Sequence, residues 1–163
     1  ALVNGGEDVI IDIGEHYVKR SDRNRTEIMT SGGVMQLSVQ LRHANKPRQP
    51  MQSIEIDYSK RWQHQHWIAL VSAYKRTPYF DYYADFFRPF YEQETRFLVD
   101  FNEKIHDVIV RLMANDEPRT KGKEQRLITT VDWAGQDLES TFGNGQSILD
   151  ILFEYGPESV MKI

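Results

Sequence analysis

The sequence predicts an α+β fold, with a small mixed or antiparallel sheet from the N-terminal half and helices from the C-terminal half. Two observations support this class. Segments with β-branched or alternating apolar residues lie before residue 59, and apolar residues recur at helical spacing after it. The length of 163 residues and a hydrophobic content of 40% suit one folded unit. We therefore expect a single domain over residues 1–163.

Four segments are predicted to form strands. Residues 8–13 are apolar and β-branched, which is typical of a strand buried on at least one face. Residues 26–30 and 34–41 flank the turn sequence Ser31-Gly32-Gly33, and a Gly-Gly pair between two such runs indicates a hairpin. Residues 53–58 alternate between apolar and polar side chains and predict a fourth strand.

Two helices are predicted in the middle of the chain. Ser59 is a candidate N-cap for the first, whose buried face would carry residues at helical spacing: Trp62, His66, Leu70 and Tyr74. Thr77-Pro78 resembles an N-cap followed by proline at the first helical position of the second. We expect this second helix to stop or kink near Arg88-Pro89, because proline has no backbone N–H to donate.

Two more helices are predicted towards the C-terminus. Residues 97–112 place seven apolar side chains on one side of a helix. Residues 148–152 form a short apolar helix that Gly156 and Pro157 should end, since glycine accepts the left-handed conformation and proline cannot continue a helix.

The composition excludes several classes of function. The chain has no cysteine, which rules out disulfides and thiolate chemistry and suits the cytoplasm. A net charge of −4 argues against a nucleic-acid surface, because such surfaces are normally basic. We see no membrane span and no signal peptide. Dinucleotide-binding, phosphate-loop and zinc motifs are absent, so we expect no cofactor and no metal site.

His66 is the candidate catalytic residue. His64 and His66 cannot easily share a metal ion, because residues two apart on a helix point about 200° away from each other. His66 lies on the apolar stripe with Trp62 and Tyr74, facing the interior or an aromatic cleft. It is either a buried histidine satisfied by one hydrogen bond or an acid/base group, since an unperturbed pKa of about 6.5 suits proton transfer.

The stretch from Tyr17 to Arg25 places cations and an amide between two predicted strands. Arg25 offers a planar fork of donors and Asn24 both donates and accepts hydrogen bonds, so together they could bind a carboxylate, a phosphate or sugar hydroxyls. The alternative is that Asn24 and Arg25 pin the connection by bonding backbone carbonyls. The residues alone leave both interpretations open.

Several segments together resemble the WbqC-like protein family. They are DVIIDIGEHYVKRSDRNRTEI, QLSVQL, SIEIDYSKRWQHQHWIALVSAYKRTPYFDYY and QSILDILFEYGPES, in this order along the chain. Family members usually begin with a further strand, which we expect this single WbqC-like domain to lack. Carried over position by position, the family pattern marks six residues for a site: Lys19, Asn24, Arg25, Trp62, His66 and Tyr74.

The resemblance implies a role in surface polysaccharide synthesis, because genes of this family tend to lie in clusters for O-antigen and related polymers. The leading hypothesis is a group transferase acting on a nucleotide-linked or amino sugar. Arg25 and Lys19 would neutralise an anionic group on a nucleotide sugar or other small molecule, Asn24 would orient it, and His66 would move a proton. The alternative is a non-catalytic binding or assembly protein, in which aromatic helices serve packing or self-association into a homo-oligomer.

Overall fold

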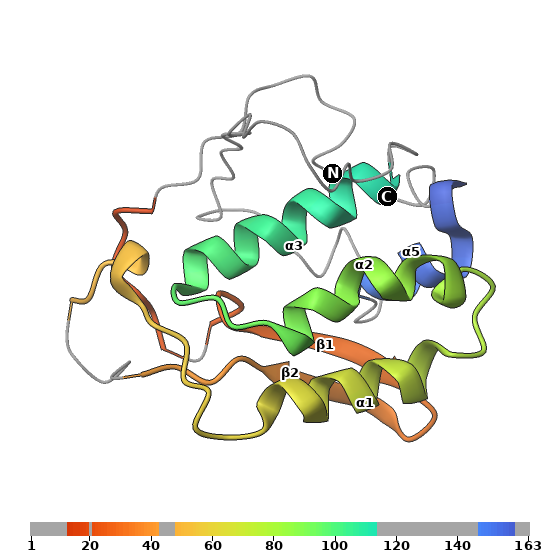
Figure 1. Ribbon diagram of the computed structural model, residues 1–163, viewed down its shortest axis with the longest axis horizontal. Helices are drawn as coiled ribbons and strands as arrows, with labels where there is room; N and C mark the ends of the chain where they lie inside the picture. Colours follow the sequence, from red (N-terminus) through yellow and green to blue (C-terminus); the bar gives the residue numbers. More distant parts are fainter. Residues whose placement is uncertain (1–12, 20, 43–47, 114–146, 159–163) are drawn as a thin grey trace.

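The computed structural model of the protein describes residues 13–19, 21–42, 48–113 and 147–158 (Figure 1). Within these residues an antiparallel hairpin precedes the α-helices, which confirms the predicted α+β class. The elements are β1 (Arg25–Thr30), β2 (Gly33–Ser38), a 3-10 helix η1 (Met51–Ser53), α1 (Trp62–Tyr74), α2 (Phe80–Glu92), α3 (Leu98–Met113) and α5 (Ile148–Tyr155). The predicted strand over residues 8–13 lies almost wholly outside the described residues.

The hairpin presents one face to the helices and the other to solvent. Its turn uses Gly33 at a φ of 104°, a conformation that L side chains rarely adopt. Ile28 and Leu37 are buried on the inner face, while Met29 and Val34 pair on the outer face and are 40% and 53% exposed. The predicted hairpin is therefore confirmed, but the expected alternation holds only in part, because Met35, which pairs with Ile28 on the same face, is 44% exposed.

The segment predicted as a fourth strand does not form a regular ladder. Its first residue belongs to η1, and the rest makes two isolated antiparallel bridges, Leu41 to Ile56 and Glu55 to Phe97. Ile54 and Ile56 are nevertheless buried, as the alternation predicts. The alternation of apolar residues therefore predicted correctly which side chains are buried. The two bridges, however, are single residue pairs and do not continue into paired strands.

Both predicted N-caps in the middle of the chain are wrong. Helix α1 begins at Trp62 with Arg61 in the N-cap position, and Ser59 lies two residues earlier, in a turn where its amide donates to Asp57 Oδ1 at 2.9 Å. Helix α2 begins at Phe80, and the Thr77 hydroxyl instead donates to the carbonyl of Tyr74 at the end of α1. Short polar side chains near a helix end can satisfy either a turn or a cap, and the sequence alone does not decide between them.

Helix α2 also runs through the proline that was expected to end or kink it. Pro89 lies inside the helix, which continues to Glu92. Only one turn of helix follows Pro89. The carbonyl of Pro89 accepts a hydrogen bond from the Gln93 amide, and this bond closes the C-terminal end of the helix. The missing N–H therefore removes a single helical bond.

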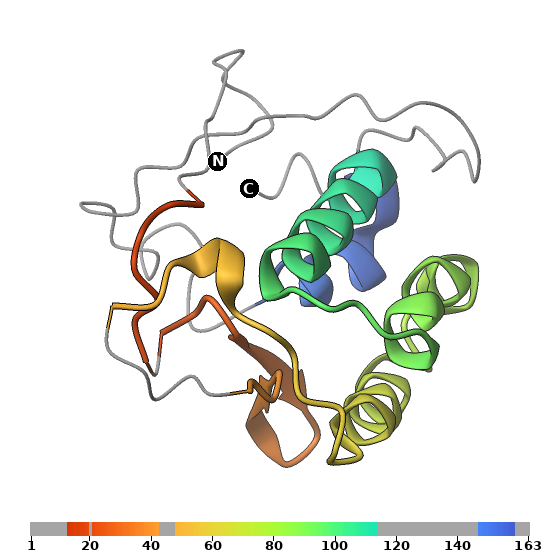
Figure 2. The same ribbon diagram turned by 60° about the vertical axis from the view of Figure 1, so that its left-hand side comes forward.

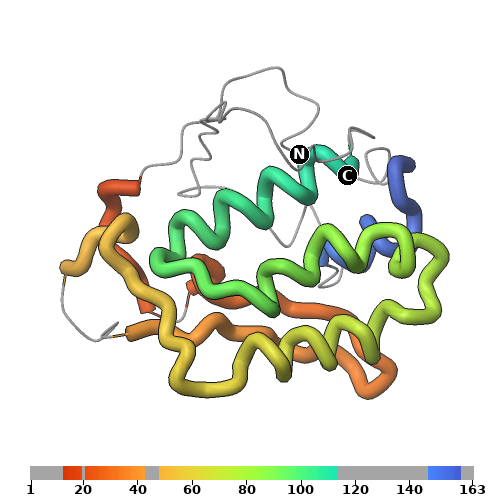
Figure 3. Tube along the Cα trace, viewed as in Figure 1, coloured from red at the N-terminus to blue at the C-terminus, as the bar shows by residue number. Residues whose placement is uncertain are grey.

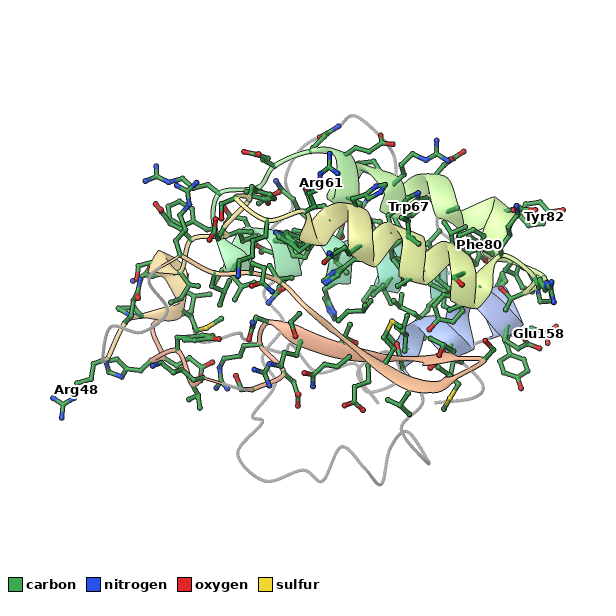
Figure 4. The ribbon with its side chains drawn as sticks, turned by 90° about the horizontal axis from the view of Figure 1, so that it is seen from below. Arg48, Arg61, Trp67, Phe80, Tyr82 and Glu158 are labelled. Atoms are coloured by element: carbon green, nitrogen blue, oxygen red, sulfur yellow. The ribbon has the colours of Figure 1, made fainter. Side chains whose placement is uncertain are left out.

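The helices pack around α2 over the hairpin. Helices α1 and α2 lie side by side and antiparallel, and α3 and α5 each pack against α2 (Figure 1 and Figure 2). The tube in Figure 3 shows β1 and β2 running alongside α1. Trp67 of α1 and Phe80 of α2, labelled in Figure 4, have ring centroids 6.4 Å apart. The described core has two clusters, one around Leu70, Phe87 and Phe153 and one around Ile54, Trp62 and Leu98.

Gly156 ends α5 in a conformation that other residues resist. Its φ is 56° and its ψ −130°, and a Cβ added there would overlap the ring of Tyr79. We expect Gly156→Ala to lower the free energy of unfolding by about 2 kcal/mol or more, from backbone strain and the displaced ring. Chemical denaturation measures this loss.

The matched control is Gly32→Ala. A Cβ at Gly32 meets only Thr30 Oγ1, at 3.8 Å, so the change should be close to neutral. Tyr79→Ala removes the ring but leaves the backbone strain, so Gly156→Ala should cost less in this background than in the wild type. Equal stability of Gly156→Ala and Gly32→Ala would contradict the interpretation.

Candidate functional site

The structure places three of the six predicted site residues around one point on the hairpin, the backbone of Ser38. Arg25 pairs with Ser38 across the two strands, and His66 accepts a hydrogen bond from the Ser38 amide. Trp62 packs on His66 with ring centroids 5.0 Å apart in an edge-to-face arrangement. Asn24 lies next to this group, because its carbonyl accepts a hydrogen bond from the Val39 amide, one residue beyond Ser38. Lys19 and Tyr74 lie elsewhere.

His66 acts in this structure as an acceptor for the edge of the sheet. Asn24 and Val39 form a hydrogen-bonded pair through Val39 N and Asn24 O, so the next pair, Arg25 and Ser38, has outward-pointing amides. The Ser38 N–H points away from β1 and donates to His66 Nε2 at 3.2 Å. His66 is 8% exposed, and the bond requires an unprotonated Nε2.

Burial lowers the pKa of His66 to about 4, well below its ordinary value. The imidazole is therefore neutral at neutral pH, because the charged form would lose its hydration inside the cluster of Trp62 and Tyr91. His64, two residues earlier, is exposed, as the helical spacing predicts. Proton transfer by His66 stays a prediction, and it would first require Nε2 to release the Ser38 amide.

Arg25 is the cation of this group without a partner. Its guanidinium forms no hydrogen bond and no ion pair with the described residues, and its Nε is buried and unpaired. The charge of Arg25 acts on Tyr17. Burial raises the pKa of the Tyr17 phenol, and the positive charge of Arg25 partly opposes this increase. A buried guanidinium nitrogen without an acceptor is costly, so the arrangement favours an anionic ligand that would supply one.

Asn24 is fixed in place by bonds on both ends of its amide. Tyr17 OH donates to Asn24 Oδ1 at 2.9 Å, and Asn24 Nδ2 donates to the carbonyl of Val39 at 3.0 Å. Nearby, Arg23 forms a two-pronged ion pair with Glu15, with both contacts at 2.7 Å. These bonds hold the segment before β1, and they set the position from which Arg25 projects.

Trp62 belongs to the core beneath the site. It is 2% exposed, and its indole Nε1 donates to the carbonyl of Asp57 at 2.9 Å. Its ring also contacts Phe101 of α3 edge to face, with centroids 5.8 Å apart. A ligand would therefore reach Trp62 only after displacing its neighbours, and the described geometry gives it the role of supporting His66.

Tyr74 lies two turns beyond His66 on α1 and belongs to a different cluster, which sequence reasoning missed. Its hydroxyl donates to Asp150 Oδ1 at 2.6 Å, and the same oxygen accepts from the Met29 amide at 3.3 Å. Burial, followed by the bond to Asp150, raises the pKa of the Tyr74 phenol. Asp150 Oδ2 accepts from the Ser147 amide at 2.6 Å, which closes a capping box on α5.

A signal for Asp150 was present in the sequence. A serine followed three residues later by an acidic residue, at the start of an apolar run, resembles a capping box, and Ser147 and Asp150 fit this spacing. The pattern predicts the cap, but it does not reveal that the carboxylate also binds α1 and β1. Lys19 is exposed on a turn and joins neither cluster.

No group of three or more metal-binding side chains occurs among the residues that the structure describes. Within the same residues, no helix is long and apolar enough to cross a bilayer. The side chains described around Ser38 are a neutral imidazole, a fixed amide and an unpaired guanidinium. Of these described groups, the guanidinium is the one left to bind an anion through charge and hydrogen bonds.

The fold and this group of side chains define a small α+β protein with a candidate anion-binding site at the edge of a hairpin. The model of the WbqC-like protein family matches residues 7–127, which is more than half of the chain. The chain therefore belongs to the WbqC-like protein family. No curated protein and no solved structure matches it significantly.

Proposed function

We propose that the protein acts in surface polysaccharide (O-antigen) biosynthesis as a group transferase whose substrate is a nucleotide-linked or amino sugar. Membership of the WbqC-like family supports the setting, because genes of this family tend to lie in polysaccharide clusters. The anionic groups of a nucleotide-linked sugar are phosphates. The site around Ser38 supplies a cation whose buried Nε has no hydrogen-bond acceptor among the described residues.

The observation that carries the proposal is the unpaired guanidinium of Arg25. Two other half-buried arginines in the described part of the chain have carboxylate partners, Arg23 with Glu15 and Arg111 with Asp107. Arg25 has its Nε buried and no described acceptor. A phosphate group would accept from the terminal nitrogens of Arg25, and from Nε as well once the atoms that cover Nε are displaced, which gives the two-pronged contact typical of arginine with phosphate.

Within this proposal the other residues have distinct roles. Asn24 would fix the segment before β1 through Tyr17 and Val39, so that Arg25 is presented in one position. His66 would hold β2 through Ser38, and it is the group proposed to move a proton once Nε2 is free. Lys19, which is exposed and lies apart from this group, would attract an anionic ligand through its charge alone.

A second candidate is a non-catalytic binding or assembly protein. It is favoured by the neutral, hydrogen-bonded state of His66, which leaves the described site without a base ready for proton transfer. In that case Arg25 would still bind an anion, but no bond of the ligand would change. The two candidates therefore agree on binding and differ on turnover.

The proposal is tested by titrating the protein with UDP-N-acetylglucosamine and with inorganic phosphate in a calorimeter. Arg25→Gln should weaken binding about tenfold or more, because the charge and the fork of donors are both lost. Arg25→Lys should recover part of the affinity, since it restores the charge alone.

The control is Arg61→Gln, an exposed arginine at the start of α1 that Figure 4 labels. It should bind both probes like the wild type, and all variants should melt within a few degrees of one another. If Arg25→Gln and Arg61→Gln bind with equal affinity, the assignment of Arg25 is wrong. If binding depends on Arg25 but mass spectrometry shows no change in the sugar with any donor, the second candidate is favoured.

A further inference from the structure

A separate polar pocket of about 420 Å³ lies on three stretches of chain that are far apart in sequence. The three stretches are Arg42, which follows β2, residues 55–58, which precede α1, and the loop that connects α2 to α3. The lining residues are Arg42, Glu55, Ile56, Tyr58, Glu94 and Arg96. None of them belongs to the site around Ser38.

The walls of this pocket are held by backbone bonds. The Arg42 amide donates to the carbonyl of Glu55 at 2.8 Å, and the Ile56 amide donates to the carbonyl of Arg96 at 2.9 Å. Tyr58 OH donates to the carbonyl of Thr95 at 2.9 Å and accepts from its amide at 2.8 Å. The three stretches are therefore fixed relative to one another, and the pocket is formed before any ligand arrives.

Two of the four charges in the pocket neutralise each other. Arg96 binds Glu55 through Nε at 2.9 Å and through a terminal nitrogen at 2.8 Å. The other two, Arg42 and Glu94, form no ion pair within 4 Å and no side-chain hydrogen bond with the described residues, although the charge of Arg42, after the hydrogen bonds from Ser59, helps to lower the pKa of Asp57. The pocket thus offers a cation and an anion without a hydrogen-bonded partner among the described residues, on walls that come from different parts of the chain.

This charge pattern points to the class of ligand. A simple anion such as phosphate would be attracted by Arg42 and repelled by Glu94. A simple cation would be attracted by Glu94 and repelled by Arg42. A molecule with one ammonium and one acidic group satisfies both side chains. The volume lies within the range of about 300–1,000 Å³ that holds small ligands.

We propose that this pocket binds a small zwitterion, with Arg42 on its acidic group and Glu94 on its ammonium group. The site goes beyond the proposed function and is independent of Arg25. Only the choice of an amino sugar phosphate as the probe comes from that function. Glu55 and Arg96 remain paired in the lining, and Tyr58 fixes the wall next to Glu94 through its bonds to Thr95.

The test uses three probes that differ in their charged groups, measured by calorimetry at pH 7.5. Glucosamine 6-phosphate carries both charges, glucose 6-phosphate lacks the ammonium group, and glucosamine lacks the phosphate. The wild type should bind glucosamine 6-phosphate about tenfold more tightly than either of the others, because only this probe pairs both side chains. Equal affinity for glucosamine 6-phosphate and glucose 6-phosphate, or no binding of glucosamine 6-phosphate, would overturn the proposal.

Two variants assign each charge. Glu94→Gln should weaken glucosamine 6-phosphate about tenfold and leave glucose 6-phosphate unchanged or tighter, since a repulsion is removed. Arg42→Gln should weaken glucosamine 6-phosphate about as much and leave glucosamine unchanged or tighter. Misfolding would lower the affinity for every probe, so this crossed pattern separates loss of a contact from loss of the fold.

Three controls locate the binding. Glu92→Gln and Arg61→Gln change exposed residues outside the pocket and should bind glucosamine 6-phosphate like the wild type. Because Arg25 is itself proposed to bind phosphate, the three probes are also measured with Arg25→Gln, in which the preference for glucosamine 6-phosphate over glucose 6-phosphate should persist. If Arg25→Gln loses glucosamine 6-phosphate while Arg42→Gln and Glu94→Gln keep it, the ligand lies at the Ser38 site and the pocket proposal fails.

Discussion

Replacing Asp150 by alanine is expected to lower the free energy of unfolding by about 3 kcal/mol, because three donors lose their acceptor at once. The Tyr74 hydroxyl would remain inside the core without a partner, in a residue that is 3% exposed. The Met29 amide would lose its acceptor on the outer edge of β1, and Ser147 would lose half of its capping box. Urea denaturation followed by circular dichroism measures the loss.

The phenol and the carboxylate can be separated by a double-mutant cycle. Tyr74→Phe removes the hydroxyl, so Asp150→Ala should cost less in this background than in the wild type, by about 1–2 kcal/mol. The control is Glu154→Ala, one turn later on α5, which changes an exposed acidic residue and should be close to neutral. Strictly additive losses for Tyr74→Phe and Asp150→Ala would mean that their hydrogen bond contributes nothing to stability.

His66 is expected to make the fold sensitive to acid over a defined range. Its pKa is about 4 in the folded protein and about 6.5 when unfolded, so the unfolded state binds more protons between these values. The stabilising effect is complete above pH 6.5 and falls as the pH drops towards 4, by about 3 kcal/mol in total. His66→Gln should lose this part of the acid sensitivity while keeping an acceptor for the Ser38 amide.

Two further variants complete the test. His66→Leu leaves the Ser38 amide unpaired and should cost about 1–3 kcal/mol at pH 7.5, where His66→Gln costs less. His64→Gln changes an exposed histidine on the same helix and should keep the pH profile of the wild type. Measurements of unfolding free energy at pH 7.5, 6, 5 and 4 compare them. Parallel profiles for the wild type and His66→Gln would show that burial of this imidazole is not what lowers stability in acid.

The parts of the fold that were predictable from the sequence are those governed by local periodicity. The hairpin around Gly33 and the buried stripe of Trp62, His66, Leu70 and Tyr74 follow directly from spacing, and both are confirmed. Helix starts were missed because the relevant competition is between neighbouring hydrogen bonds. The Asp57 carboxylate takes the Ser59 amide, and the Tyr74 carbonyl takes the Thr77 hydroxyl.

The residues of the candidate site were chosen from the sequence, and their function stays a prediction, whereas their grouping is seen only in the structure. Helical spacing alone predicted that His66 lies on the buried face of its helix. Its hydrogen bond with the Ser38 amide could not be predicted in this way, because the bond forms only where α1 packs beside the hairpin. Asp150 was missed because it meets Tyr74 and Met29 only after distant segments have packed together. The pocket of Arg42 and Glu94 depends on three separate stretches of chain and has no signature in any one of them.

The hairpin has outward amides bound by side chains from two helices, one on β2 by His66 and one on β1 by Asp150. Asp150 follows Met29 by 121 residues, so it leaves the ribosome long after the strand that it caps. At about 5–20 residues per second, the Met29 amide waits on the order of ten seconds for this acceptor. During that time this amide of the growing chain is available for pairing with another strand.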